Sequence, residues 1–115
     1  MTRALIASTM AEDELQANVL DLCRVFGILV HHCRPARMAD GTWRAPNSGN
    51  PGFPDLCMVG RRGVLYRELK TSAGKPTRDQ QIWLSALTGA GADACLWRPG
   101  DWLSGLIRRQ LEAIR

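Results

Sequence analysis

The sequence lacks any stretch typical of a membrane or secreted protein. No apolar run approaches the roughly 18 residues needed to cross a bilayer. The first residues, Met1 to Ala7, have neither the long apolar segment nor the small-residue cleavage site of a secretory signal. We therefore expect a cytoplasmic protein.

The cysteine spacing of a zinc site is also missing. Cys23, Cys33, Cys57 and Cys95 are scattered along the chain, with no Cys-x-x-Cys pair and no ladder of cysteine and histidine. Each of them has apolar neighbours, which is typical of a reduced, buried thiol that packs as a small apolar side chain.

Internal repeats, low-complexity tracts and signs of a second domain are absent as well. A chain of 115 residues with 45% apolar and 23% charged residues has the composition of an ordinary globular protein. Its length suits one small domain over residues 1–115.

The charge is mildly basic, because 15 Lys and Arg residues outnumber 11 Asp and Glu residues and give +4. This excess alone is weak evidence for a polyanionic partner. Several cations are clustered, and on charge alone a solvated face explains Arg34, Arg37 and Arg44 equally well. The clustered cations are Arg34, Arg37, Arg44, Lys70, Lys75 and Arg78.

Hydrophobic periodicity and turn residues predict an α/β protein with the element order α-β-β-β-α-β-α. Residues 34–54 are expected to form a long loop, of a length that is usually functional or mobile. Helices are expected at 11–26, from Thr77 to Gly89, and after Pro99 to Asp101 as one C-terminal helix; strands are expected at 28–33, 55–60, 64–70 and 94–97.

Two acids and a lysine carry the chemistry. Asp55 opens one predicted strand, and Glu68 and Lys70 lie near the end of the next, beyond a turn at residues 61–63. Residues at i and i+2 of a strand share a face, so Glu68 and Lys70 point to the same side. If the strands pair through the turn, Asp55 comes close to Glu68, and two such carboxylates repel unless a cation or a proton separates them.

An oxygen-rich pair with open positions suits Mg²⁺ or Mn²⁺, which keep water molecules and bind phosphate oxygens. A nearby lysine can hold an attacking water or offset charge on a phosphate in the transition state. This chemistry is metal-assisted hydrolysis of a phosphodiester. A lone Glu-x-Lys is common by chance, and its value here comes from its position in the hairpin.

Together these residues resemble the PD-(D/E)xK nuclease superfamily, and within it the small VRR-NUC type that phages often encode. The resemblance implies a restriction-endonuclease-like core with a central mixed sheet flanked by helices, and the bacterial host cytoplasm as the location if a phage encodes the chain. The matching segments are Gly52 to Leu56, Glu68 to Lys70, Gly74-Lys75, Gln80 with Trp83-Leu84, and Trp97 to Trp102.

The resemblance also implies roles. Asp55 and Glu68 would bind the metal with the backbone carbonyl of Leu69, and Lys70 would position the nucleophilic water. Gln80 would orient a ligand or contact the DNA backbone; its alternative is a capping box with Thr77, and both roles are compatible. Similar stand-alone domains tend to be homodimers that cut branched DNA such as Holliday junctions. The alternatives are an inactive nuclease fold that binds DNA and, third, a protein-interaction domain.

The first helix offers a further acid, Glu12 or Glu14. Glu12 falls within roughly 40° of the centre of the apolar face and Glu14 about 120° away, which favours Glu12 as a catalytic residue and metal ligand. The family's early glutamate precedes a glutamine by four residues, which also fits Glu12 and Gln16.

For DNA contacts, arginines of the long loop would neutralise phosphates without reading sequence. His31 and His32 should point to opposite faces; partial exposure is the plain alternative to a role, and the resemblance favours His32. Trp43 would stack on an unpaired base or pin the loop, whereas Trp83, Trp97 and Trp102 are expected to pack in the protein. The predicted nucleic-acid contacts are Arg34, Arg37, Arg44, Lys75, Arg78 and His32.

Overall fold

The computed structural model describes residues 2–32, 36–44 and 48–115. Within these ranges no helix is both long and apolar enough to span a bilayer. The helices and strands, in chain order, are α1 (Arg3–Thr9), α2 (Glu12–Phe26), β1 (Leu29–His32), β2 (Ala36–Arg37), β3 (Trp43–Arg44), β4 (Leu56–Gly60), β5 (Gly63–Leu69), α3 (Arg78–Gly89), β6 (Asp93–Trp97), α4 (Pro99–Leu103) and α5 (Leu106–Ile114).

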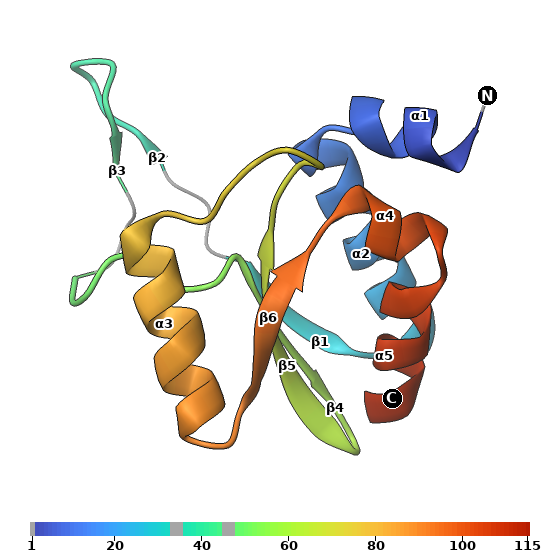
Figure 1. The fold of residues 1–115 in the computed structure, drawn as a ribbon. Helices are drawn as coiled ribbons and strands as arrows, with labels where there is room; N and C mark the ends of the chain where they lie inside the picture. Colours follow the sequence, from blue (N-terminus) through green and yellow to red (C-terminus); the bar gives the residue numbers. More distant parts are fainter. Residues whose placement is uncertain (1, 33–35, 45–47) are drawn as a thin grey trace.

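The main sheet has four strands in the order β1-β4-β5-β6 (Figure 1). The β1–β4 and β4–β5 pairs are antiparallel, whereas β5 and β6 run parallel, with α3 in the connection between them. The sheet is therefore mixed and flanked by helices, as the sequence and the resemblance predict. The short β2–β3 pair forms a separate two-stranded sheet.

The hydrophobic core lies between the sheet and the helices α2, α4 and α5, on the side opposite α3 (Figure 1). Alternation along the strands sends Leu56 and Met58 of β4 into this layer. Leu15 and Val19 of α2 and the apolar stripe of α5 are buried against them. These buried helix residues recur at the helical spacing that predicted the two apolar faces from the sequence.

The sheet face on the α3 side is covered less completely. No residue of α3 is buried, and the side chains of Leu29, Val59 and Val64 are exposed. These three residues are cross-strand neighbours in the register. By alternation, Cys57 and Tyr66 lie on this face as well. Asp55 and Glu68, two residues further along, therefore lie on the side of the sheet opposite the main core.

Three elements differ from the sequence prediction. The N-terminal segment forms α1, which Thr2 caps by accepting a hydrogen bond from the backbone N–H of Leu5 at 3.2 Å. The predicted loop over 34–54 contains the β2–β3 pair. The expected single C-terminal helix is two helices, because Gly105 adopts a left-handed backbone conformation with φ of 85° between them.

Candidate metal-binding active site

The hairpin of β4 and β5 brings Asp55 and Glu68 together. Its register pairs Gly60 with Gly63 at the turn and Leu56 with Arg67 at the other end. One further step places Asp55 opposite Glu68. Cross-strand partners share a face, so the two carboxyl groups lie on the same side of the sheet, and the Asp55 carboxyl raises the pKa of Glu68.

The carboxylate of Asp55 is fixed by the backbone of β5. Its Oδ2 accepts a hydrogen bond from the backbone N–H of Leu69 at 2.8 Å. One carboxylate oxygen therefore faces the strand, which sets the direction of the other. The hydrogen bond links Asp55 to the residue between Glu68 and Lys70, so the three candidate catalytic residues share one rigid frame.

The residues before Asp55 explain the local geometry of the Gly-Phe-Pro-Asp segment. Gly52 has φ of 96°, and a Cβ there would lie 2.5 Å from the backbone carbonyl carbon of Asp79 in α3. Only glycine allows this backbone conformation and this close approach without strain. Pro54 is buried directly before Asp55, so the chain enters β4 in a fixed direction.

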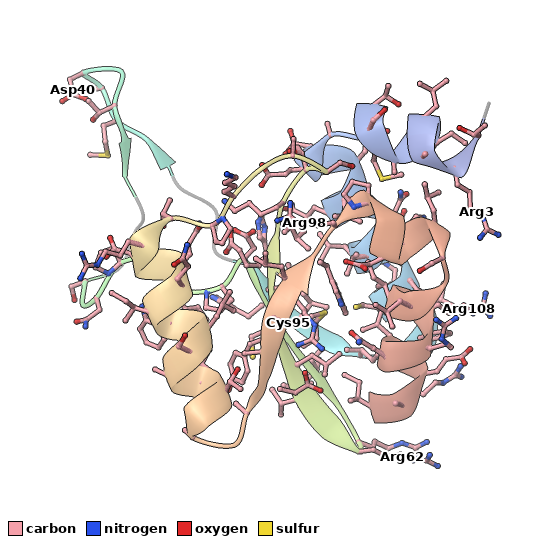
Figure 2. The ribbon with its side chains drawn as sticks, in the orientation of Figure 1. Arg3, Asp40, Arg62, Cys95, Arg98 and Arg108 are labelled. Atoms are coloured by element: carbon pink, nitrogen blue, oxygen red, sulfur yellow. The ribbon has the colours of Figure 1, made fainter. Side chains whose placement is uncertain are left out.

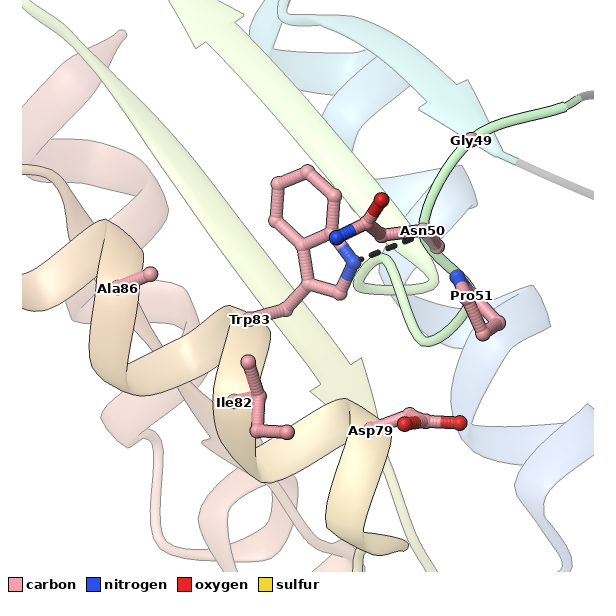
Figure 3. A pocket seen from close by; sticks show the side chains of 7 residues that line it. All are labelled: Gly49, Asn50, Pro51, Asp79, Ile82, Trp83 and Ala86. Atoms are coloured by element: carbon pink, nitrogen blue, oxygen red, sulfur yellow. Dashed lines mark hydrogen bonds between the residues drawn. The ribbon is translucent and has the colours of Figure 1, made fainter.

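Aromatic packing holds the same segment against α3. The ring of Phe53 packs edge-on against Tyr66 and Trp83, with centroid distances of 6.0 and 5.0 Å. The indole N–H of Trp83 donates to the backbone carbonyl of Asn50 at 3.2 Å (Figure 3). Trp83 thus ties the segment that carries Asp55 to the helix, which agrees with the packing role predicted for it.

Glu68 is the most unusual ionisable group of the site. The residue is 2% exposed, and its Oε1 has no hydrogen-bond partner among the residues that the structure describes. Burial and, to a lesser extent, the neighbouring Asp55 carboxyl raise the pKa of Glu68 to about 8, although the Lys70 ammonium opposes both. Desolvation and like charge therefore outweigh the lysine.

Lys70 follows β5 directly and faces Glu68. Its Nζ lies 3.5 Å from Oε2 of Glu68, and its backbone N–H donates to the carbonyl of Trp97 at 3.1 Å. The parallel strand β6 thus holds the backbone of Lys70 while its side chain reaches the acid. Glu68 and Lys70 therefore lie on the same side of the strand, as the sequence predicts.

The structure does not bring Glu12 to this pair. Glu12 is the first residue of α2 and is exposed, as is Glu14. Over residues 2–32, 36–44 and 48–115, no group of three or more histidine, cysteine and acidic side chains is arranged to hold a metal ion. The role of Glu12 stays a prediction, and so does the carbonyl of Leu69 as a ligand.

Gln80 forms the capping box of α3. Its Oε1 accepts from the backbone N–H of Thr77 at 2.8 Å, and Thr77 Oγ1 accepts from the backbone N–H of Gln80 at 3.2 Å. The structural role predicted for Gln80 is thus confirmed. A contact of Gln80 with a ligand or DNA stays a prediction.

Of the predicted nucleic-acid contacts, Lys75 and Arg78 are exposed just before and at the start of α3. His32 pairs with Leu56, whose side chain is in the core, whereas the exposed His31 pairs with Cys57 and shares the face of the acids. Arg34 lies outside the described residues, and the side chains of Arg37, Trp43 and Arg44 are not described.

One buried residue was missed by sequence reasoning: Arg67 is 1% exposed. Its guanidinium donates to the backbone carbonyl of Asp93 at 2.8 Å and to Oε1 of Gln110 at 3.1 Å, and it lies 5.0 Å from the ring of Trp97. A hydrophobic pattern gives no signal for a buried cation. The strand pattern did contain a hint. Arg67 alternates with Leu65 and Leu69, which both face the core, so its side chain had to point inward as well.

The donors at the site fit a hard divalent cation. Mg²⁺ and Mn²⁺ prefer oxygen ligands, and Mg²⁺ is commonly bound by one or two carboxylates, with water and phosphate oxygens completing the shell. Asp55 and Glu68 supply such a pair of carboxylates. Oε1 of Glu68 accepts no hydrogen bond from the described residues, so it is available as a ligand.

A mixed four-stranded sheet flanked by helices on both sides defines the restriction-endonuclease-like fold, which confirms the predicted fold class. The structure is similar to a solved structure described as a VRR_NUC domain protein, with a TM-score of 0.63 and 21% sequence identity over 90% of each chain. No protein-family model matches the sequence, and no curated protein matches it. At this identity the similarity shows the fold, and it agrees with the resemblance found in the motifs.

Proposed function

We propose that the chain is a divalent-metal-dependent endonuclease that hydrolyses phosphodiester bonds of DNA. The observation that carries this proposal is the buried Glu68 carboxyl, which faces Asp55 and Lys70 at the end of the central hairpin. A buried acid beside a second acid is unfavourable unless a proton or a cation compensates it. The fold shared with the VRR_NUC domain protein supports a nuclease-type domain.

Asp55 and Glu68 would hold Mg²⁺ or Mn²⁺, with the Leu69 carbonyl as a further ligand. A divalent ion bound there supplies Lewis-acid polarisation of the phosphate and a lowered pKa of bound water. Asp55 is preoriented for binding by the N–H of Leu69. Burial excludes bulk water around Glu68, which strengthens electrostatic interactions at the site.

Lys70 acts on the phosphate. Its ammonium offsets the negative charge that develops as the phosphodiester is attacked, and its N–H groups orient the attacking water. The hydrogen bond from its backbone to Trp97 and the ion pair with Glu68 restrict its position. Gln80 assists at the start of α3 by orienting a ligand or contacting the DNA backbone.

The substrate proposed is branched DNA such as a Holliday junction, cut by a homodimer. One 115-residue domain offers a small surface for a branched substrate, whereas two symmetric copies supply two active sites. Lys75 and Arg78, just before and at the start of α3, neutralise phosphates, together with Arg34, Arg37 and Arg44.

The test is cleavage of labelled four-way-junction and flap DNA with Mg²⁺ or Mn²⁺. We expect the wild type to cut, and Asp55→Ala and Lys70→Ala to be slower by about 100-fold or more, since each removes a group used in the transition state. Asp21→Ala is the matched control, because Asp21 is an exposed acid on α2 paired with Arg24.

The outcomes separate the candidate functions. Equal cleavage by the wild type and Asp55→Ala would refute the site. Binding of DNA without cleavage under either metal would favour an inactive nuclease fold that only binds DNA. Absence of any salt-dependent DNA affinity would favour the protein-interaction domain.

A further inference from the structure

Arg98 bridges two backbone carbonyls of the loop that follows Lys70. It lies where β6 passes into α4 (Figure 2). Its Nη1 donates to the carbonyl of Thr71 at 2.7 Å and to the carbonyl of Gly74 at 2.6 Å. One charged nitrogen thus closes a four-residue loop, and hydrogen bonds from a charged donor are stronger than neutral ones.

The same loop is held at other points. The N–H of Gly74 donates to Thr71 Oγ1 at 3.0 Å, and Ser72 Oγ donates to the carbonyl of Ala7 in α1 at 2.7 Å. A Cβ at Gly74 would lie 2.9 Å from Thr71 Oγ1, so the loop has little room to adjust. Its conformation is therefore well determined, and Arg98 adds two charged hydrogen bonds to the Gly74–Thr71 bond across the loop.

Arg98 is itself fixed by the start of α4. The backbone N–H of Arg98 donates to Oδ2 of Asp101 at 2.8 Å. In return, the backbone N–H of Asp101 donates to the carbonyl of Arg98 at 2.9 Å. Pro99, the next residue, is buried. The neighbouring residue Trp97 accepts the backbone hydrogen bond of Lys70. The end of β6 therefore anchors Lys70 and its loop from two adjacent residues.

We propose that Arg98 is a positioning residue for Lys70. It holds the Thr71–Gly74 loop and thereby keeps the ammonium of Lys70 next to Glu68, without contacting the metal or the DNA. This inference rests on the proposed function. Lysine has a long, flexible side chain, so the place of its ammonium depends on the backbone from which it starts. A small displacement of a catalytic group is enough to slow an enzyme.

The experiment compares the wild type, Arg98→Met and Arg98→Lys in junction cleavage with Mn²⁺, below the melting temperature of every variant. Methionine keeps an unbranched apolar stem without donors, whereas lysine keeps N–H donors. We expect Arg98→Met to lower kcat by about ten- to a hundredfold, with KM within about twofold. We expect Arg98→Lys to recover most of the lost kcat.

Arg62→Met is the matched control. Arg62 is exposed at the tip of the β4–β5 hairpin, at the opposite end of the sheet (Figure 2), and its replacement removes the same charge. Amide hydrogen exchange adds a readout independent of cleavage. The amide of Gly74 should exchange about tenfold faster or more in Arg98→Met than in Arg62→Met, because the loop opens locally.

Normal kcat in Arg98→Met overturns the inference. A loss that falls on KM with a weaker salt dependence also overturns it, because that result assigns Arg98 to a phosphate contact. A wild type that cleaves no DNA overturns the proposed function itself, whereas a cleaving wild type with an unaffected Arg98→Met overturns only the positioning role.

Discussion

The pKa of Glu68 results from opposing influences of its surroundings. Burial and Asp55 favour its protonated form, and Lys70 favours its charged form. A pKa of about 8 means that, without a metal, much of this group is protonated at neutral pH. A divalent cation would replace that proton, so metal affinity should rise with pH up to about 8.

The raised pKa of Glu68 predicts a pH-dependent stability. Its folded-state pKa lies above the ordinary value of 4.5, so the stabilisation is complete below pH 4.5 and is lost as pH rises through about 8. In EDTA, the free energy of unfolding of the wild type should fall across this window relative to Glu68→Gln, by on the order of a few kcal/mol.

Urea denaturation of both proteins at a series of pH values measures this difference. Mn²⁺ added at pH 8 should restore stability to the wild type and leave Glu68→Gln nearly unchanged, because the amide cannot replace an ionised ligand. Parallel stability curves for the two proteins would contradict the account of Glu68.

Arg67 joins β5, β6 and α5 from inside the core, and it predicts a stability effect. Arg67→Met removes the hydrogen bonds to the carbonyls of Tyr66 and Asp93 and to Gln110, and should lower the free energy of unfolding by about 1–3 kcal/mol. Arg24→Met is the control, because Arg24 pairs with Asp21 in an exposed ion pair, where the loss should stay within about 1 kcal/mol. Equal losses in the two variants would show that the buried hydrogen bonds contribute nothing.

At the scale of elements, the segment before β4 determines where Asp55 stands. Gly52→Ala would place a Cβ against the backbone of Asp79 and strain a left-handed residue. We expect the segment to shift, and cleavage to slow by about tenfold or more. The rate of junction cleavage by folded protein, checked by circular dichroism, measures this effect.

Gly49→Ala is the matched control for this prediction. Gly49 has φ of 100°, but a Cβ there meets nothing within 4 Å. Both variants should therefore lose about 1–2 kcal/mol from backbone strain, while only Gly52→Ala loses activity. Equal rates in the two variants would show that the contact with Asp79 does not position Asp55.

The elements that build the site were the ones that the sequence predicted best. Two short apolar runs separated by the turn at Arg61-Arg62 specify the β4–β5 hairpin, and the register then follows. The split of the C-terminal helix was missed because its apolar spacing continues across Gly105, and the β2–β3 pair was missed because two-residue strands leave no period to detect.

At the scale of the whole molecule, the predicted mixed sheet and its flanking helices are confirmed, because element order and hydrophobic faces restrict the topology. The pairing of Asp55 with Glu68 follows from one hairpin and was readable from local sequence. The place of Glu12 was not, since it depends on how α2 packs against the sheet. The helical angle of Glu12 gave its face but not its distance from the acids.

The central claim is that Asp55 and Glu68 share one divalent ion. Crystals soaked in Mn²⁺ and measured at the manganese absorption edge test this claim directly. The account predicts an anomalous peak bonded to a carboxylate oxygen of each residue, and no such peak in Glu68→Gln. A peak elsewhere on the protein, with none between these two acids, would contradict it.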